Sequence, residues 1–149
     1  MNTVVNEKRT SVTEQNKELL RKAVDEIWNK GKFQLLDDFI TGDFVVHFSR
    51  PGEELQGTKN VKQFYTNLRE AFPDIHFTIV DQVAEGDKVV THWTASGTHK
   101  GEFKGIPATG KKVIFSAMDI DRVINGKVKE CWTNVDELSL MKQLGVIPQ

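Results

Sequence analysis

The chain has 149 residues, of which 28% are charged and 38% are hydrophobic, and its formal net charge is -1. This length suits one domain with its own core, and the near-neutral charge gives no electrostatic reason to expect nucleic acid or a membrane surface as a partner. The single cysteine, Cys131, excludes an internal disulfide and a multi-cysteine zinc site, and it is compatible with a reducing compartment.

The first eleven residues form a polar segment without the apolar core of a secretion signal. We interpret residues 1–11 as a flexible leader. No apolar run approaches the length needed to cross a bilayer, so we expect a cytoplasmic protein with a single domain over residues 12–149.

Helical spacing of apolar residues predicts three helices in the first half of the chain. The clearest helix begins at Thr13, which can cap it, and ends at Lys30 before Gly31. A shorter helix is expected over residues 33–39, and another over 60–71 before Pro73. The apolar stripe of the first helix is broad enough to lie against a sheet.

Strand patterns dominate the second half of the chain. A short strand over residues 44–48 and a loop over 50–57, which could form part of a pocket rim, precede the third helix. Alternating residues then predict four strands, and a short helix closes the chain; these elements lie at 75–83, 88–98, 112–124, 127–135 and 137–144. The Asn125-Gly126 pair suits a tight hairpin, so the last two strands are expected to be antiparallel neighbours. Helices followed by strands predict an α+β fold, with helices on one face of a curved antiparallel sheet.

Both faces of the strand over residues 112–124 carry apolar side chains. Val113 and Phe115 lie on one face, whereas Ile114, Met118 and Ile120 lie on the other. Such a sheet needs a cover on each side, and its own helices cover only one. We therefore expect a homodimer.

Asp119 is unusual because it shares a face with Phe115 and Ala117. An apolar setting disfavours the charged form of a carboxyl group and raises its pKa, so Asp119 could act as a neutral hydrogen-bond donor or as a general acid. The alternative is an ordinary ion pair with a nearby basic residue such as Arg122. His47 stands on the opposite face of its strand from Phe44 and Phe48, where a structural or surface role is the alternative to a functional one.

A curved sheet around a helix leaves a conical cavity, and ligand pockets are mostly apolar with a few polar groups. The candidate lining has this mixture: Trp28, Phe64, Phe72, Trp93, Phe115, Trp132, His47, Asp119 and Thr133. Core packing is the alternative for the aromatic residues, and both faces of the sheet cannot line one cavity. No phosphate loop, nucleophile elbow or metal-binding histidine pair occurs. Two kinds of function remain possible: acid–base chemistry without metal or cofactor, and ligand binding alone.

Four stretches of the sequence carry a resemblance to a known family: WNKGKFQLLDDFITGDFVVH, NVKQFYTNLREAFPD, EGDKVVTHWTASGTHKGEFKGIPATGKKV and DIDRVINGKVKECWTNVDELSLMKQLG. Together they resemble the SnoaL-like polyketide cyclase, or ester cyclase, family over about residues 12–148. The string G-T-H-x-G-x-F-x-G-I-P-x-T-G is fairly specific to that group. The resemblance implies the cone-shaped nuclear-transport-factor-two-like fold, with a deep pocket and commonly a dimer formed across the sheet.

The resemblance also suggests roles for three residues. Asp119 stands where ketosteroid isomerase has its oxyanion-stabilising aspartic acid and where the founding cyclase has a pocket histidine. His47 falls near the position of the isomerase's catalytic base. Thr133 occupies the place of the aspartate that is the acid–base catalyst of the founding cyclase.

A threonine hydroxyl is no general base near neutral pH, so two functional classes stay open. In the enzyme hypothesis, His47 removes a proton next to a carbonyl or ester group, and neutral Asp119 donates a hydrogen bond to the developing enolate. In the binding hypothesis, the cavity holds a small apolar or aromatic molecule, which Asp119 and Thr133 orient.

Overall fold

The computed structural model describes residues 11–148, so residues 1–10 of the expected leader lie outside it. Its elements are α1 (Val12–Ala23), η1 (Val24–Asn29), η2 (Phe33–Leu35), α2 (Leu36–Phe39), β1 (Ile40–His47), β2 (Glu54–Gln56), α3 (Thr58–Ala71), β3 (His76–Glu85), β4 (Lys88–Thr98), β5 (Lys112–Ile124), β6 (Lys127–Val135) and α4 (Glu137–Leu144). The predicted α+β class is confirmed. None of the helices within residues 11–148 is long and apolar enough to cross a membrane.

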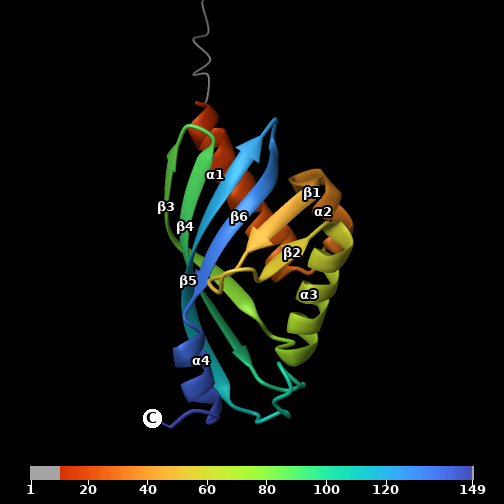
Figure 1. The fold of residues 1–149 in the computed structure, drawn as a ribbon, viewed down its shortest axis with the longest axis vertical. Helices are drawn as coiled ribbons and strands as arrows, with labels where there is room; N and C mark the ends of the chain where they lie inside the picture. The colour runs from red at the N-terminus through yellow and green to blue at the C-terminus, as the bar shows by residue number, and fades with distance from the viewer. Residues whose placement is uncertain (1–10, 149) are drawn as a thin grey trace, which may run out of the picture.

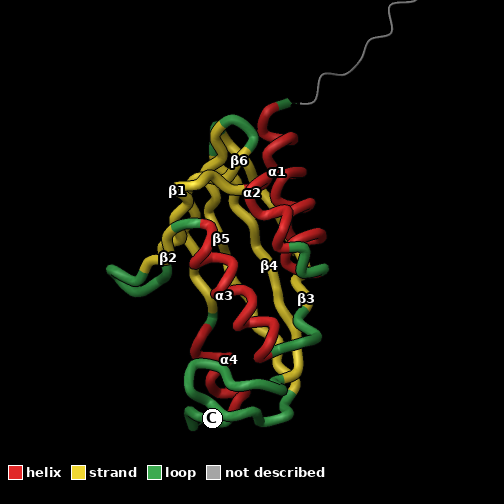
Figure 2. The backbone as a smooth tube through the Cα atoms, turned by 90° about the vertical axis from the view of Figure 1, so that its right-hand side faces the viewer, coloured by secondary structure: helices red, strands yellow, loops and turns green. Residues whose placement is uncertain are grey.

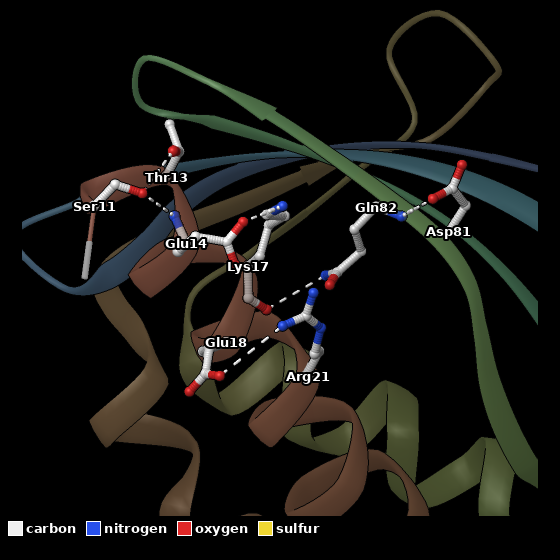
Figure 3. Close-up of polar contacts among 8 residues, drawn as sticks. All are labelled: Ser11, Thr13, Glu14, Lys17, Glu18, Arg21, Asp81 and Gln82. Carbon is white, nitrogen blue, oxygen red and sulfur yellow. Dashed lines mark hydrogen bonds and ion pairs between the residues drawn. The ribbon is translucent and has the colours of Figure 1, made fainter. Parts of the chain in front are cut away.

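The first helix has the predicted extent but a different cap. Ser11, not Thr13, is the N-cap, because its hydroxyl oxygen accepts a hydrogen bond from the backbone N–H of Glu14 at 3.2 Å (Figure 3). The α-helix α1 then continues as the π-helix η1 up to Asn29. Gln82 of β3 reaches toward α1, where its side-chain amide lies 3.4 Å from the carbonyl oxygen of Lys17 (Figure 3). This contact links the helix to the edge of the sheet.

The six strands form one sheet in the order β2-β1-β6-β5-β4-β3 (Figure 1). Strands β3 to β6 follow one another as an antiparallel meander, as predicted, and the β5–β6 hairpin turns at Asn125 and Gly126, which both have positive φ. Strand β1 is longer than expected and pairs parallel to β6, with Val46 opposite Cys131. The expected loop over residues 50–57 contains the short strand β2, which pairs with β1.

Helices α1 and α3 lie over the same face of the curved sheet (Figure 2). The apolar residues of these helices and the inward residues of the strands form two core clusters. One cluster includes Ile27 of η1, Val61 of α3 and Val89 of β4, which are almost completely buried. The other includes Phe72 and Leu140 near the opposite end of the sheet. The hydrophobic core therefore lies between the helices and this concave face.

The convex face of the sheet carries an apolar row that no element within residues 11–148 covers. Val83, Val90, Ile120 and Trp132 stand opposite one another on the four successive strands β3, β4, β5 and β6. Their exposed fractions are 62%, 37%, 40% and 37%. We call these four residues the convex row. Its continuity comes from the strand register, because facing residues in antiparallel strands project to the same side.

Candidate active site

A cavity of about 190 Å³ lies between the concave face of the sheet and the helices. Its wall is mostly apolar and includes the aromatic residues Trp28, Phe39, Phe44, Phe48, Phe64, Tyr65, Phe77, Trp93, Phe103 and Phe115. Polar groups are few: the strands contribute Thr91, Asp119, Asp121, Cys131 and Thr133, while Glu53, Lys104 and Glu137 come from connecting segments and the start of α4. Pockets for drug-sized ligands measure about 300–1,000 Å³, so this enclosure suits a compact molecule.

Asp119 projects from β5 into this cavity, as the strand pattern predicted. Thr133 stands opposite it on β6 and donates its hydroxyl hydrogen to Oδ1 of Asp119 at 2.5 Å. Burial raises the pKa of Asp119 to about 6, while hydrogen bonds from Thr133 and Trp93 act in the opposite direction. The apolar setting therefore outweighs the two donors, and this carboxyl titrates close to neutral pH.

A second carboxyl group, Asp121, lies in the same cavity and is only 6% exposed. Burial and the nearby charge of Asp119 raise the pKa of Asp121 well above its ordinary value, and a hydrogen bond with the Cys131 side chain opposes them. One carboxylate oxygen of each aspartate and the Cys131 sulfur all lie within 4.8 Å of one another. Asp121 was missed as a site residue, although its spacing of two from Asp119 already placed both on one strand face.

Two further titratable groups stand beside this acidic pair. Burial is the main cause that raises the pKa of the Cys131 thiol and of the Tyr65 hydroxyl, and the charges of Asp119 and Asp121 add to it in both cases. Tyr65 comes from α3, on the opposite wall from the strands, and its ring stacks on Trp28 at a centroid distance of 4.0 Å. Both groups hold their protons at neutral pH, so they can only be hydrogen-bond donors or neutral acceptors.

Five of the six residues predicted to bind substrate line the cavity: Thr133, Trp28, Phe64, Trp93 and Phe115. Phe72 does not. It is 1% exposed and packs in the core against His99 and Phe103, with a ring centroid distance of 5.3 Å to each. Trp132 belongs to the convex row, on the other side of the sheet. Core packing, the alternative for the aromatic residues, applies to Phe72.

The hypothesis that His47 shares a pocket with Asp119 must be corrected. His47 faces the convex side of the sheet and stacks on Trp132 at 5.4 Å between ring centroids. Its Nδ1 lies 2.9 Å from Glu54 Oε1, and its Nε2 lies 2.7 Å from Glu130 Oε2. The physical reason is the two-residue period of β1, which sends Val46 into the cavity and His47 away from it. His47 is thus outside the reach of any ligand in the cavity.

The loop over residues 99–110 contributes Phe103 and Lys104 to the cavity wall. The loop is held against the end of α3, because the backbone N–H groups of Lys100 and Gly101 donate to the carbonyl oxygen of Ala71 at 2.9 and 3.1 Å. A side chain on Gly101 would place its Cβ 2.4 Å from the carbonyl oxygen of Glu70. Glycine at this position therefore permits the close approach of the loop to the helix.

The acidic pair with Cys131 is also the one group of side chains within residues 11–148 whose spacing suits a metal ion. A carboxyl or thiol group must lose its proton before it coordinates a metal. Because the pKa values of Asp121 and Cys131 are raised, metal binding would compete with two protons near neutral pH. Metal binding at this group would therefore release protons and depend on pH.

Comparisons with known proteins agree with this fold. The family model described as SnoaL-like polyketide cyclase matches residues 18–144. Aklanonic acid methyl ester cyclase DnrD of Streptomyces peucetius is 28% identical over 134 residues, which cover 86% of this chain and 89% of that protein. Among solved structures, IdmH from Streptomyces antibioticus, a candidate polyketide cyclase, matches with a TM-score of 0.78 and 29% identity over 88% of this chain and 99% of that one. TsrD from Streptomyces laurentii matches with a TM-score of 0.80 and 25% identity over 93% of this chain and 100% of that one.

Proposed function

Because the chain belongs to the SnoaL-like polyketide cyclase family, we propose that it catalyses acid–base chemistry without metal or cofactor on a small hydrophobic carbonyl or ester compound. The reaction is proton abstraction beside the carbonyl group, followed by isomerisation or ring closure. The observation that carries this proposal is a carboxyl group, Asp119, whose pKa is raised to about 6 inside a mostly apolar cavity. A general base works best when its pKa lies near the operating pH.

Asp119 takes the role of base in this proposal, in place of His47. Its carboxyl is mostly ionised at pH 7, and the Thr133 hydroxyl that donates to it fixes its orientation. Trp93, which donates a hydrogen bond to Asp119, and Phe115 of β5 belong to the apolar wall of the same cavity. The name of the relative DnrD, a cyclase of a methyl ester, supports a carbonyl compound with an ester group as the substrate class.

The test follows exchange of the acidic C–H proton in D₂O by NMR, with aryl β-keto methyl esters and small cyclic ketones as probes. Loss of a general base lowers the rate by about 10²–10⁴-fold, and this is the expected effect of Asp119→Asn. Asp81→Asn is the control, since Asp81 is an exposed carboxylate of β3 outside the cavity. An Asp119→Asn variant with the wild-type exchange rate contradicts the role of Asp119.

A protein that binds a ligand without converting it is the second candidate function. Thr133, at the position where the resemblance places an aspartate, favours this candidate, because a hydroxyl can orient a ligand but is no base at neutral pH. A small aromatic ligand that raises the melting temperature and is recovered unchanged after long incubation would support it. Chemical conversion of that ligand would contradict the binding function.

We also propose that the protein is a homodimer, with the convex row at its interface. The row is apolar and exposed across four strands, and a second copy of the same surface would cover it. Ile120→Asp is expected to give a monomer in sedimentation velocity experiments. Asn67→Asp, which adds a charge on an exposed residue of α3 away from the convex face, is the control. A wild-type monomer at high concentration would refute the proposal.

A further inference from the structure

The proposed base leaves the second half of the reaction unassigned, because a proton donor is needed for the carbonyl oxygen. Asp121 lies two residues from Asp119 on the same face of β5, and both line the cavity. The groups that face this pair from neighbouring elements are the Cys131 and Thr133 side chains of β6, the Thr91 and Trp93 side chains of β4 and the Tyr65 hydroxyl of α3. No cation stands among these neighbours.

Two carboxylates within 4.8 Å of each other in an apolar enclosure do not both ionise near neutral pH, since like charges there are poorly screened. The pair therefore holds one proton. Its location follows from the hydrogen bonds. Thr133 donates a short hydrogen bond to Asp119, which favours the ionised form of that group, whereas the partner of Asp121 is the weaker thiol donor of Cys131.

We propose that Asp121 is the general acid of this site and forms a one-proton pair with the base Asp119. The role of Asp121 as general acid presupposes the acid–base reaction proposed above. It adds a catalytic residue from the same strand and replaces the pairing of Asp119 with His47, which lies on the convex side. Because Asp121 is 6% exposed, bulk water has little access to its proton.

The proton balance of the step is closed within the pair. The Asp119 carboxylate takes the proton from the carbon beside the carbonyl, and the electron pair of that C–H bond forms the enolate. In a ring closure, the enolate carbon bonds to a second carbonyl carbon, whose oxygen receives the proton of Asp121. Asp119 is then protonated and Asp121 ionised, and one proton passing from Asp119 to Asp121 restores the starting state.

The Tyr65 hydroxyl fits this arrangement as an orienting donor. Burial and the charges of Asp119, Cys131 and Asp121 raise the pKa of this hydroxyl, so it stays protonated. It comes from the helix side of the cavity, so it can approach the substrate oxygen from the wall opposite the pair. The pair and Tyr65 together favour a substrate whose reacting oxygen lies between the sheet and α3.

The first arm of the test needs no substrate. Carboxyl groups labelled with ¹³C on aspartate are titrated by NMR in the wild type, Asp119→Asn and Asp121→Asn. The wild type is expected to keep one protonated buried carboxyl through pH 7, and Asp121→Asn is expected to lose that signal. In Asp119→Asn the pKa of Asp121 should fall, because the neighbouring negative charge is gone. A wild type with both buried carboxyls ionised at pH 7 would overturn the pair.

The second arm measures turnover as a function of pH, with circular dichroism to confirm that each variant is folded. The wild type should give a bell-shaped profile, whose alkaline limb reports the loss of the Asp121 proton. Asp121→Asn is expected to lower turnover by about 10²-fold or more and to remove the alkaline limb, while Asp121→Glu restores part of the rate and the limb. A merely structural role for Asp121 would lower turnover and leave the shape of the profile unchanged.

The two arms separate failure of the inference from failure of the proposed function. If the titration shows the one-proton pair but no probe is converted, the proposed function fails while the pair stands. If turnover depends on Asp119 but Asp121→Asn keeps the wild-type rate and profile, Asp121 is not the acid and the proposed function survives.

Discussion

Replacing Asp119 with asparagine should make the protein more stable above about pH 6. Burial raises the pKa of Asp119 from 3.8 to about 6. Since each pKa unit corresponds to about 1.36 kcal/mol, ionising this group costs about 3 kcal/mol more in the folded protein than in the unfolded chain. The folded state binds the Asp119 proton more tightly than the unfolded chain does, and this tighter binding stabilises the fold. The stabilisation is complete below about pH 4 and is lost as the pH rises through about 6. Asparagine, which never ionises, avoids that cost.

The assay is urea denaturation at intervals between pH 4 and pH 8, for the wild type, Asp119→Asn and the exposed control Asp81→Asn. Subtracting the free energies of unfolding of Asp119→Asn from those of the wild type cancels the titration of most other groups. This difference should fall by about 2.4 kcal/mol from pH 4 to pH 8, with most of the change between pH 4 and pH 6. A difference that stays constant or increases with pH would refute a raised pKa at Asp119 and weaken its assignment as base.

Three further variants test separate contacts. Thr133→Val removes a hydrogen bond worth about 1.5–3 kcal/mol to a charged acceptor, so the acid limb of the pH–rate profile should move upward by about one to two pH units; an unmoved limb would separate Thr133 from the titration of Asp119. His47→Gln should leave turnover unchanged. Hydrogen bonding to Glu130 raises the pKa of His47, so protonated His47 stabilises the fold below its ordinary pKa near 6.5, and this contribution is lost as the pH rises through the raised value. Urea unfolding of His47→Gln should therefore show a loss of about 1 kcal/mol at pH 6 and a smaller loss at pH 9, and equal losses would contradict the ion pairs. Gly101→Ala should destabilise the fold by about 1–3 kcal/mol, because its Cβ meets a backbone carbonyl; an unchanged melting temperature would show that the loop shifts freely.

Periodicity predicted most of the fold because it acts locally. The strand face that carries Asp119 and Phe115 was correctly assigned from two-residue alternation, and the turn at Asn125-Gly126 follows from its backbone requirements. The bounds of β1 were missed because it pairs with the distant strand β6 in an irregular register, and β2 was missed because it has only 3 residues. The parallel contact between β1 and β6 leaves no local pattern in either segment.

The site was predicted only in part, because strand periodicity assigns a residue to a face of the sheet but does not show its burial or its distant neighbours. Asp119 and Thr133 were found from strand position and resemblance, and they are hydrogen-bonded to each other. Asp121 was not singled out, although it shares a strand face with Asp119, because only its burial in the folded protein distinguishes it from a strand-end carboxylate. For His47 the strand pattern indicated the correct face, whereas the resemblance suggested a catalytic role. The cytoplasmic location and the dimer stay predictions.

The parallel pairing of β1 with β6 determines when the cavity can form during synthesis. His47 and Glu130, which meet across these strands, are 83 positions apart in the chain. The ribosome must therefore release almost the whole chain before β1 finds its neighbour, whereas β3, β4 and β5 can pair as soon as each emerges. Until then the edge of β1 that pairs with β6 has no partner, while β2 can already pair with its other edge. The nascent chain thus passes through a state with an incomplete sheet, in which one wall of the cavity is missing. Chaperones could bind the chain in this interval.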